Sequence, residues 1–166
     1  MKKLKFLLLL SLIVNPIFGQ EFPYNDDKKI EFKEIFELSD KLTKEQVLER
    51  TEKWANSYWS VPNLINKSDK SITYKVTDKS SRKVGLVVNS TFEIFYNLKV
   101  SVKEGKYKYT LSDFQVVEVG IMKYTLEKRI KKKKIKKFAW AEIQKLISSL
   151  TTAIKSGEND SEKDDW

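Results

Sequence analysis

The 166-residue sequence contains no cysteine and no histidine. Without cysteine there is no disulfide, no thiolate nucleophile and no lipid anchor on an amino-terminal cysteine. Without histidine as well, the chain lacks an imidazole base that titrates near neutral pH and the usual ligands of a zinc site. Most hydrolase mechanisms are thereby excluded, and only carboxylate, Ser-Lys or hard-cation chemistry stays open. We expect no cofactor, no bound metal and no enzymatic activity.

The sequence also lacks an apolar run long enough to cross a membrane, which takes ~20 residues. Its apolar run from Phe6 to Val14 follows three lysines and stops before Asn15-Pro16, which is the layout of a secretory signal peptide. We expect cleavage near Gly19 (leader 1–19), export to the periplasm or the exterior, and no transmembrane segment in the mature chain. The mature chain keeps 29 basic residues against 23 acidic ones, a net charge of about +6 that favours anionic partners.

Residues 20–157 read as one domain that begins with a strand and a helix. The stretch "KIEFKEIFEL", residues 29–38, has the near-alternating apolar pattern of a strand. Thr43 and Gln46 are spaced as a capping box, and the apolar stripe that follows predicts a helix through Trp54 that ends near Trp59. The acidic tail, residues 158–166, is expected to be flexible.

The middle of the chain predicts four strands. After a loop at 61–71, residues 72–77 alternate, "KSSR" at 79–82 predicts a turn, and residues 83–89 form the next strand. Residues 92–102 carry apolar side chains at every even position. Gly105 then predicts a tight hairpin, in which Val102 faces Tyr107, Val100 faces Tyr109 and Leu98 faces Leu111.

At Ser112-Asp113 the apolar phase changes, which predicts a bulge or a strand end. Apolar residues from Ala139 to Ile154 recur every three or four positions, so a second helix should end before Gly157. The sequence therefore predicts an α+β fold: one antiparallel sheet of about five strands, in the chain order strand, helix, four strands, helix, with both helices packed on one face of the sheet.

This order resembles the TBP-like arrangement. The Trp-containing helix "QVLERTEKWANSYW" and the hairpin "LKVSVKEGKYKYTLSDF" are similar to an exported bacterial family, domain of unknown function 4468, over residues 30–118. The resemblance implies a TBP-like fold and supplies no activity and no functional residue. Because function depends on sites and not on folds, the likeness to a DNA-binding fold predicts no DNA binding.

The first candidate site is the lysine run, residues 128–137, with eight basic side chains: Lys128, Arg129, Lys131, Lys132, Lys133, Lys134, Lys136 and Lys137. As one helix it would hold four like-charged pairs at four-residue spacing, each costing ~0.2–0.5 kcal/mol. The run is either solvated and screened by the acidic tail, or it meets an anionic surface such as a lipid head group, a glycan or extracellular nucleic acid. Export makes genomic DNA a poor partner.

The second candidate is the solvent-facing side of the sheet, which the helices are not expected to cover. The side chains expected to project there are Lys75, Phe95, Lys99 and Lys108, beside Thr73, Lys103 and Lys106. An open sheet face carries such residues for solvation alone, and a partner can also use them. Trp54 should belong to the core, whereas Trp59 could serve as a binding platform.

Further motifs predict little. Ser80 and Lys83 have the Ser-x-x-Lys spacing of some acyl enzymes without the accompanying motifs. Asp26-Asp27 has too few ligands for a calcium loop. Glycosylation-like triplets begin at Asn66, Asn89 and Asn159.

Three functional hypotheses follow. The leading one is a non-catalytic exported module that binds a protein or an envelope component through the face or an edge of its sheet. The alternative is a polyanion binder that uses the lysine run. The third, a hydrolase with paired carboxylates, has no pair of acids that the pattern places in a shared cleft.

Overall fold

The computed structural model describes residues 21–38, 42–59, 61–84, 88–103, 105–118 and 123–156, and only the backbone of 80–84 and 88–91. The expected leader, 1–19, and acidic tail, 158–166, lie outside these residues. In chain order the elements are β1 (Phe32–Glu37), α1 (Lys44–Tyr58), β2 (Asn63–Lys67), β3 (Ser71–Val84), β4 (Val88–Lys103), β5 (Lys106–Glu118), β6 (Lys123–Thr125), α2 (Leu126–Arg129) and α3 (Lys133–Ser156).

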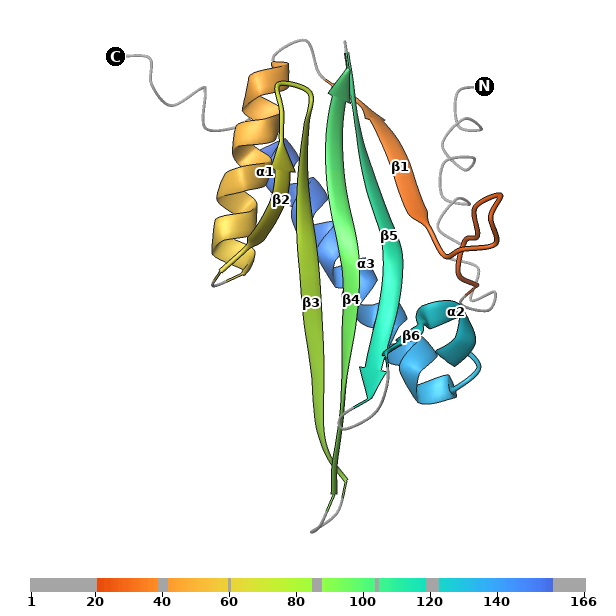
Figure 1. The fold of residues 1–166 in the computed structure, drawn as a ribbon. Coiled ribbons are helices and arrows are strands. Elements are labelled where there is room, and N and C mark those ends of the chain that lie inside the picture. Colours follow the sequence, from red (N-terminus) through yellow and green to blue (C-terminus); the bar gives the residue numbers. More distant parts are fainter. Residues whose placement is uncertain are drawn as a thin grey trace, which may run out of the picture.

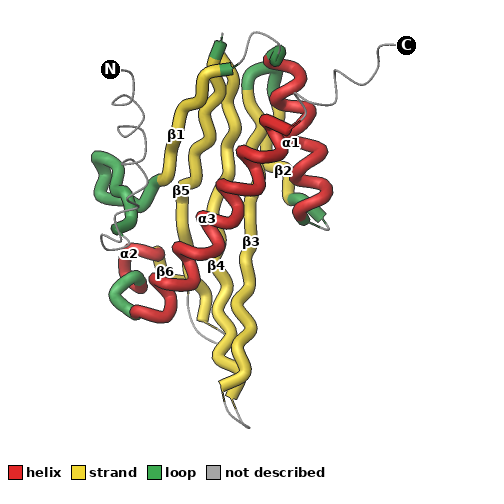
Figure 2. The backbone as a smooth tube through the Cα atoms, turned by 180° about the vertical axis from the view of Figure 1, so that it is seen from behind, coloured by secondary structure: helices red, strands yellow, loops and turns green. Residues whose placement is uncertain are grey.

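The strands form one antiparallel sheet in the order β1-β5-β4-β3-β2, and β6 pairs with the last part of β5. Helices α1 and α3 lie against the same side of this sheet (Figures 1 and 2), which we call the inner face; the opposite side is the outer face. The predicted α+β class, with both main helices on one face, is confirmed. Within the described residues, no helix is both long and apolar enough to span a membrane.

The inner face carries the core. Alternate residues of β4, from Ile94 to Val102, are at most 4% exposed, and they pack with matching residues of β3 and β5. Helix α3 adds the predicted stripe from Ala139 to Ile154. Trp54 of α1 is 5% exposed and donates from Nε1 to Ser149 Oγ at 2.9 Å, so it ties the two helices together as a core residue, as predicted.

Helix α1 begins at the predicted capping box. Thr43 Oγ1 accepts from the backbone N–H of Gln46 at 3.3 Å, and the Gln46 side chain accepts from the backbone N–H of Thr43 at 2.8 Å. Two backbone donors of the first turn are thus satisfied locally.

The β4–β5 hairpin has the predicted register, since Val102 pairs with Tyr107, Val100 with Tyr109 and Leu98 with Leu111. Gly105 adopts φ +66, the left-handed conformation that such a turn requires. The predicted irregularity is a bulge: Asn97 pairs with Ser112 and Phe95 with Gln115, so one residue of β4 faces two of β5. Asp113 there has φ 58, and its carboxylate accepts from Asn97 Nδ2 at 2.9 Å.

The predicted turn at 79–82 and the separate strand at 83–89 are wrong. Strand β3 runs through this segment to Val84 and pairs with β4 back to Val88, so Ser80 faces Phe92 and Lys83 faces Asn89 in the register. The three strands expected between 72 and 102 are one long hairpin. The polar stretch "KSSR" lacks apolar alternation, and backbone pairing with β4 forms the strand instead.

The predicted loop at 61–71 is also wrong, because it contains β2, an edge strand whose five residues are all exposed. An exposed strand has no buried face and therefore leaves no alternation in the sequence. The short elements β6 and α2 were not predicted, and α3 begins at Lys133, six residues before the apolar stripe that indicated it. Ile135, 3% exposed, anchors this first turn.

Candidate functional site

The lysine run is not one helix. It spans the end of α2, a turn, and the first residues of α3. The turn breaks the helical spacing of the like-charged pairs that begin at Lys128 and Arg129, which lowers the repulsion that a continuous helix would carry. The run lies where α2 leads into the amino-terminal end of α3 (Figure 1).

Two cations of the run have structural partners. Lys132 Nζ donates to Glu118 Oε1 at 2.7 Å, and Arg129 Nε lies 3.7 Å from the same oxygen. The Arg129 guanidinium also stacks on the Tyr124 ring at 3.5 Å from its centroid. These contacts hold the connection between α2 and α3 on the end of β5. The positive charges of Arg129 and Lys132 therefore already have a partner within the fold, Glu118.

The rest of the run faces water. Lys136 is half-buried, and the remaining members are exposed and have no ion pair among the described residues: Lys128, Lys131, Lys133, Lys134 and Lys137. These lysines form a solvent-exposed surface where α2 leads into α3.

The outer face carries a second set of cations. In the register Lys75 faces Asn97, Lys99 faces Thr73 and Thr110, and Lys108 faces Ser101 and Ile35. Lys75, Lys99 and Lys108 therefore sit on a diagonal across β3, β4 and β5, with neighbours about 7–8 Å apart. Hydroxyl and amide side chains fill the positions between them.

Some of these outer-face charges are neutralised and others are not. Ion pairs join Lys33 to Glu31 at 3.3 Å, Lys79 to Glu93 at 3.0 Å and Lys106 to Glu37 at 2.8 Å. Lys75, Lys99, Lys103 and Lys108 have no acidic partner within the part of the chain that is described. Phe95 is half-buried, and the Lys123 ammonium lies over its ring at 5.3 Å from the ring centroid. The Phe95 ring is therefore not an open stacking platform.

A cavity of about 690 Å³ lies at the end of the sheet where the β1–α1 connection, the β2–β3 turn and the β4–β5 turn meet. We call it the turn-end cavity. Backbone bonds hold its frame: the Leu38 N–H donates to the Gly105 carbonyl, and the Val102 N–H donates to the Lys70 carbonyl, both at 2.8 Å. The volume lies in the range of ordinary small-molecule sites.

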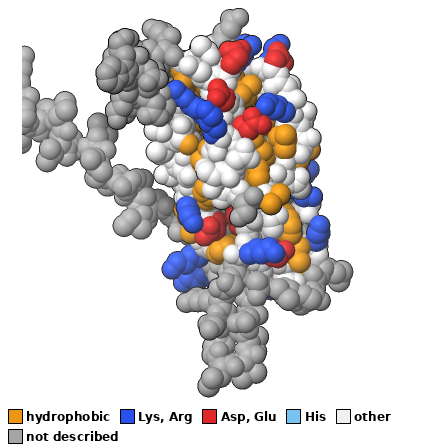
Figure 3. Space-filling view, turned by 90° about the vertical axis from the view of Figure 1, so that its left-hand side faces the viewer, with side chains coloured by type: hydrophobic (Ala, Val, Ile, Leu, Met, Phe, Trp, Pro, Cys, Tyr) orange, Lys and Arg blue, Asp and Glu red, His pale blue; other side chains and the backbone are white. Residues whose placement is uncertain are grey.

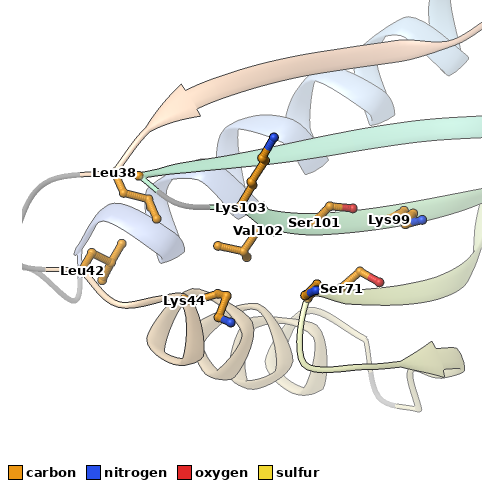
Figure 4. Close-up of a pocket in the computed structure, with 10 residues that line it drawn as sticks. Leu38, Leu42, Lys44, Ser71, Lys99, Ser101, Val102 and Lys103 are labelled. Carbon is orange, nitrogen blue, oxygen red and sulfur yellow. The ribbon is translucent and has the colours of Figure 1, made fainter.

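The cavity combines an apolar wall with a cationic rim. Figure 4 shows Leu38 and Leu42 reaching from the β1–α1 connection toward Val102. The lysines that line it come from α1, from the β2–β3 turn and from β4: Lys44, Lys70, Lys99 and Lys103. No acidic residue is among its described lining residues, and Lys44 alone of the four has a weak ion pair, 3.9 Å to Glu45.

Sequence reasoning placed Lys99 and Lys103 on the outer face but did not find Lys44 or Lys70. These two come from segments far apart in sequence, and only the pairing of β2 with β3 and the entry angle of α1 bring them to the same cavity. A single sequence carries no local signal for such a meeting.

A polar cluster interrupts the inner face. Tyr96 donates its O–H to Asp78 at 2.7 Å. Burial, aided by nearby Glu142 and opposed by the hydrogen bond from Tyr96 and by Lys145, raises the pKa of Asp78. Burial also raises the pKa of Tyr96 well above its usual value. The hydrogen bond explains why a carboxylate is tolerated here.

The remaining candidates gain no support as sites. Among the residues described, no three acidic side chains converge on a metal position. Asp26 and Asp27 form a short turn in which the Asp27 N–H donates to Asn25 Oδ1, and Asn66 is exposed on β2. The side chains of Ser80, Lys83 and Asn89, and all of Asn159, lie outside the described residues.

Trp59, the predicted platform, caps α1 and is half-buried, with its ring 5.1 Å from Trp54 and 5.8 Å from Tyr74. Its Nε1 is buried and has no hydrogen-bond partner among the described residues. It lines a second cavity, of about 360 Å³, with Tyr58, Val61, Asn63, Lys75, Val76 and Thr77.

The fold is that of an α+β protein of TBP-like arrangement. Residues 32–117 match the family model of DUF4468, a domain of unknown function with TBP-like fold, and the chain belongs to this family. The resemblance predicted over 30–118 is thereby confirmed.

Two solved structures are similar to the chain. A DUF4468 family protein from Bacteroides ovatus has a TM-score of 0.69 and 14% identity, over 83% of this chain and 92% of that chain. A TBP-like protein from Parabacteroides distasonis has a TM-score of 0.63 and 15% identity, over 81% of this chain and 97% of that one. At these identities the likeness concerns the fold alone. No curated protein sequence matches the chain.

Proposed function

We propose that the chain is an exported, non-catalytic binding module that takes a phosphate-bearing envelope component into the turn-end cavity. One observation carries the proposal: four lysines line this cavity and no acidic residue is among its described lining residues. A lysine ammonium binds phosphate as a point charge, and a concave site concentrates that charge. The apolar wall favours a ligand whose phosphate is attached to an apolar group.

The sequence supports the rest of the proposal. The signal-peptide layout of residues 1–19 favours export, where phosphate groups of lipids and glycans are the available anions. The absence of histidine and cysteine from the sequence favours a binding role over catalysis. A hydrolase that uses carboxylates remains a weaker hypothesis. The Asp78 carboxylate accepts a hydrogen bond from Tyr96, and this structural role accounts for its position without catalysis.

Binding to vesicles tests the proposal. We expect residues 20–166 to sediment with vesicles of phosphatidylglycerol and phosphatidylcholine, and not with phosphatidylcholine alone, in a salt-sensitive manner. The variant Lys70→Gln/Lys103→Gln should weaken binding about tenfold or more, because each surface lysine near anionic lipid is worth ~1 kcal/mol. Inorganic polyphosphate, measured in parallel, separates a lipid source of phosphate from a soluble one.

The matched control is Lys131→Gln/Lys134→Gln in the lysine run, which removes the same charge from exposed positions. We expect it to bind vesicles nearly as well as the unaltered chain. If the control loses binding and the cavity variant keeps it, the alternative polyanion site in the run replaces the turn-end cavity. If neither phosphate source binds, the proposal is wrong.

A further inference from the structure

The long hairpin of β3 and β4 leaves part of a sheet edge without a strand. Strand β2 pairs with β3 only between Ile72 and Lys75, and the pairing ends at Asn63 opposite Lys75. From Val76 onward, β3 has no partner on that side among the described residues. Figures 1 and 2 show β3 and β4 continuing beyond the start of β2. An open edge presents backbone donors and acceptors in register for another strand.

The 360 Å³ cavity lies where this open edge begins. Asn63 begins β2 and Val61 precedes it, Lys75 to Thr77 belong to β3, and Tyr58 with Trp59 lies at the end of α1. Val61 is 87% exposed and Leu64 and Ile65 are 45% and 53% exposed, so apolar surface borders the edge. Figure 3 faces the α1 and β2 side and shows hydrophobic side chains at the surface between charged ones.

The rings of Trp59 and Tyr58 line the cavity, so a side chain of an added strand that entered it would pack against them. The edge and the cavity would then recognise the backbone and one side chain of the same segment.

The charge of the β3 edge indicates which kind of strand could pair with it. The stretch from Lys75 to Lys83 contains four basic residues and one acid, Asp78, which is bonded to Tyr96. Lys79 is paired with Glu93 of β4, and the stretch still carries more positive than negative charge. Two copies joined along this edge would bring two cationic stretches together, and like charges on paired strands are destabilising. An acidic strand would instead be attracted.

We propose that the β3 edge from Val76 onward binds an extended acidic segment of another exported protein as an added strand, with one of its groups entering the Trp59 cavity. Main-chain hydrogen bonds supply the affinity in this mode of recognition, and the cavity and charges supply the specificity. The site is separate from the turn-end cavity and independent of its ligand.

Synthetic peptides test this site by titration calorimetry. A peptide of alternating Glu and Val should bind, the same peptide with Lys for Glu should not, and N-methylation of alternate amides should weaken binding about tenfold or more, since it removes backbone hydrogen bonds and leaves the charge. Equal binding of the methylated peptide would show a purely ionic contact and overturn the proposal.

Chain variants locate the contact. Lys75→Glu and Trp59→Phe should each weaken binding of the Glu-Val peptide about tenfold, while Lys134→Glu, on the exposed surface of α3, should leave it unchanged. Circular dichroism checks that each variant folds. Independently of any variant, hydrogen exchange should slow at amides of Val76 to Lys79 when the peptide is added; unchanged exchange there would also overturn the proposal.

Discussion

At the scale of single residues, the inner face contains a carboxyl group, that of Asp78, whose ionisation opposes folding. Asp78 accepts from Tyr96, and Glu142, Lys145 and Tyr58 are the other titratable groups that act on this pair. Burial outweighs the hydrogen bond and raises the pKa of Asp78 above its ordinary value of 3.8. The folded protein therefore holds this proton to a higher pH than the unfolded chain does.

Replacing Asp78 with Asn should raise the free energy of unfolding at pH 7. The Asp78 carboxyl costs stability progressively as pH rises from about 3.8 to its folded pKa, and the cost is complete above that pKa. Asn keeps an acceptor for Tyr96 and removes the charge. Below pH 3.8 the two proteins should have the same pH dependence. Urea denaturation of both across this range measures the difference, and a gain that persists unchanged in acid would contradict the argument.

At the scale of elements, helix α1 depends on its first turn. The reciprocal hydrogen bonds of Thr43 and Gln46 satisfy two backbone donors, and the turn also carries Lys44 into the turn-end cavity. Stability and site geometry are therefore coupled at this one helix end.

Thr43→Ala should destabilise the protein by ~1 kcal/mol, because the helix loses a side-chain cap. For a chain of this size the melting temperature should fall by roughly 2–4 °C. Thr43→Ser keeps the hydroxyl and serves as the matched control, which should melt close to the unaltered protein. Calorimetry measures both, and an Ala variant as stable as the Ser variant would show that the cap contributes nothing.

Elements with one buried face were predictable from the sequence. The β4–β5 register follows from alternation of Leu98, Val100 and Val102 and from the turn at Gly105. Strand β2 and the stretch 79–82 of β3 were not predictable, because neither shows an alternation of apolar side chains in the sequence.

The candidate site was predictable only in part, for a related reason. Lys99 and Lys103 follow from strand periodicity, whereas Lys44 and Lys70 depend on tertiary contacts. The lysine run is evident from the composition of the sequence. No local sequence pattern, however, indicates that Glu118 forms ion pairs with Arg129 and Lys132.

At the scale of the whole molecule, the lysine run and the turn-end cavity lie near opposite ends of α3. This helix has 24 residues, which corresponds to about 36 Å. The lysine run lies at its first turn, and Lys155 in its last turn lies over Phe36 of β1, near the turn end of the sheet. No small ligand contacts both regions at once.

Charge removal at the two regions should therefore act additively on non-specific retention. We expect Lys70→Gln/Lys103→Gln and Lys131→Gln/Lys134→Gln each to lower the salt needed for elution from phosphocellulose, and the quadruple variant to show the sum, as sites far apart do. Vesicle binding should follow the cavity pair alone. A quadruple variant that elutes well away from the sum would show that the two regions are coupled.

The bulge at Asp113 gives β5 two phases. Before it, odd-numbered side chains from Tyr107 to Leu111 are buried, and after it the even-numbered Phe114 and Val116 are. The first phase pairs with β1 and the second with β6. Shortening the chain by that residue would turn Phe114 and Val116 outward and bring Gln115 into the hydrophobic interior.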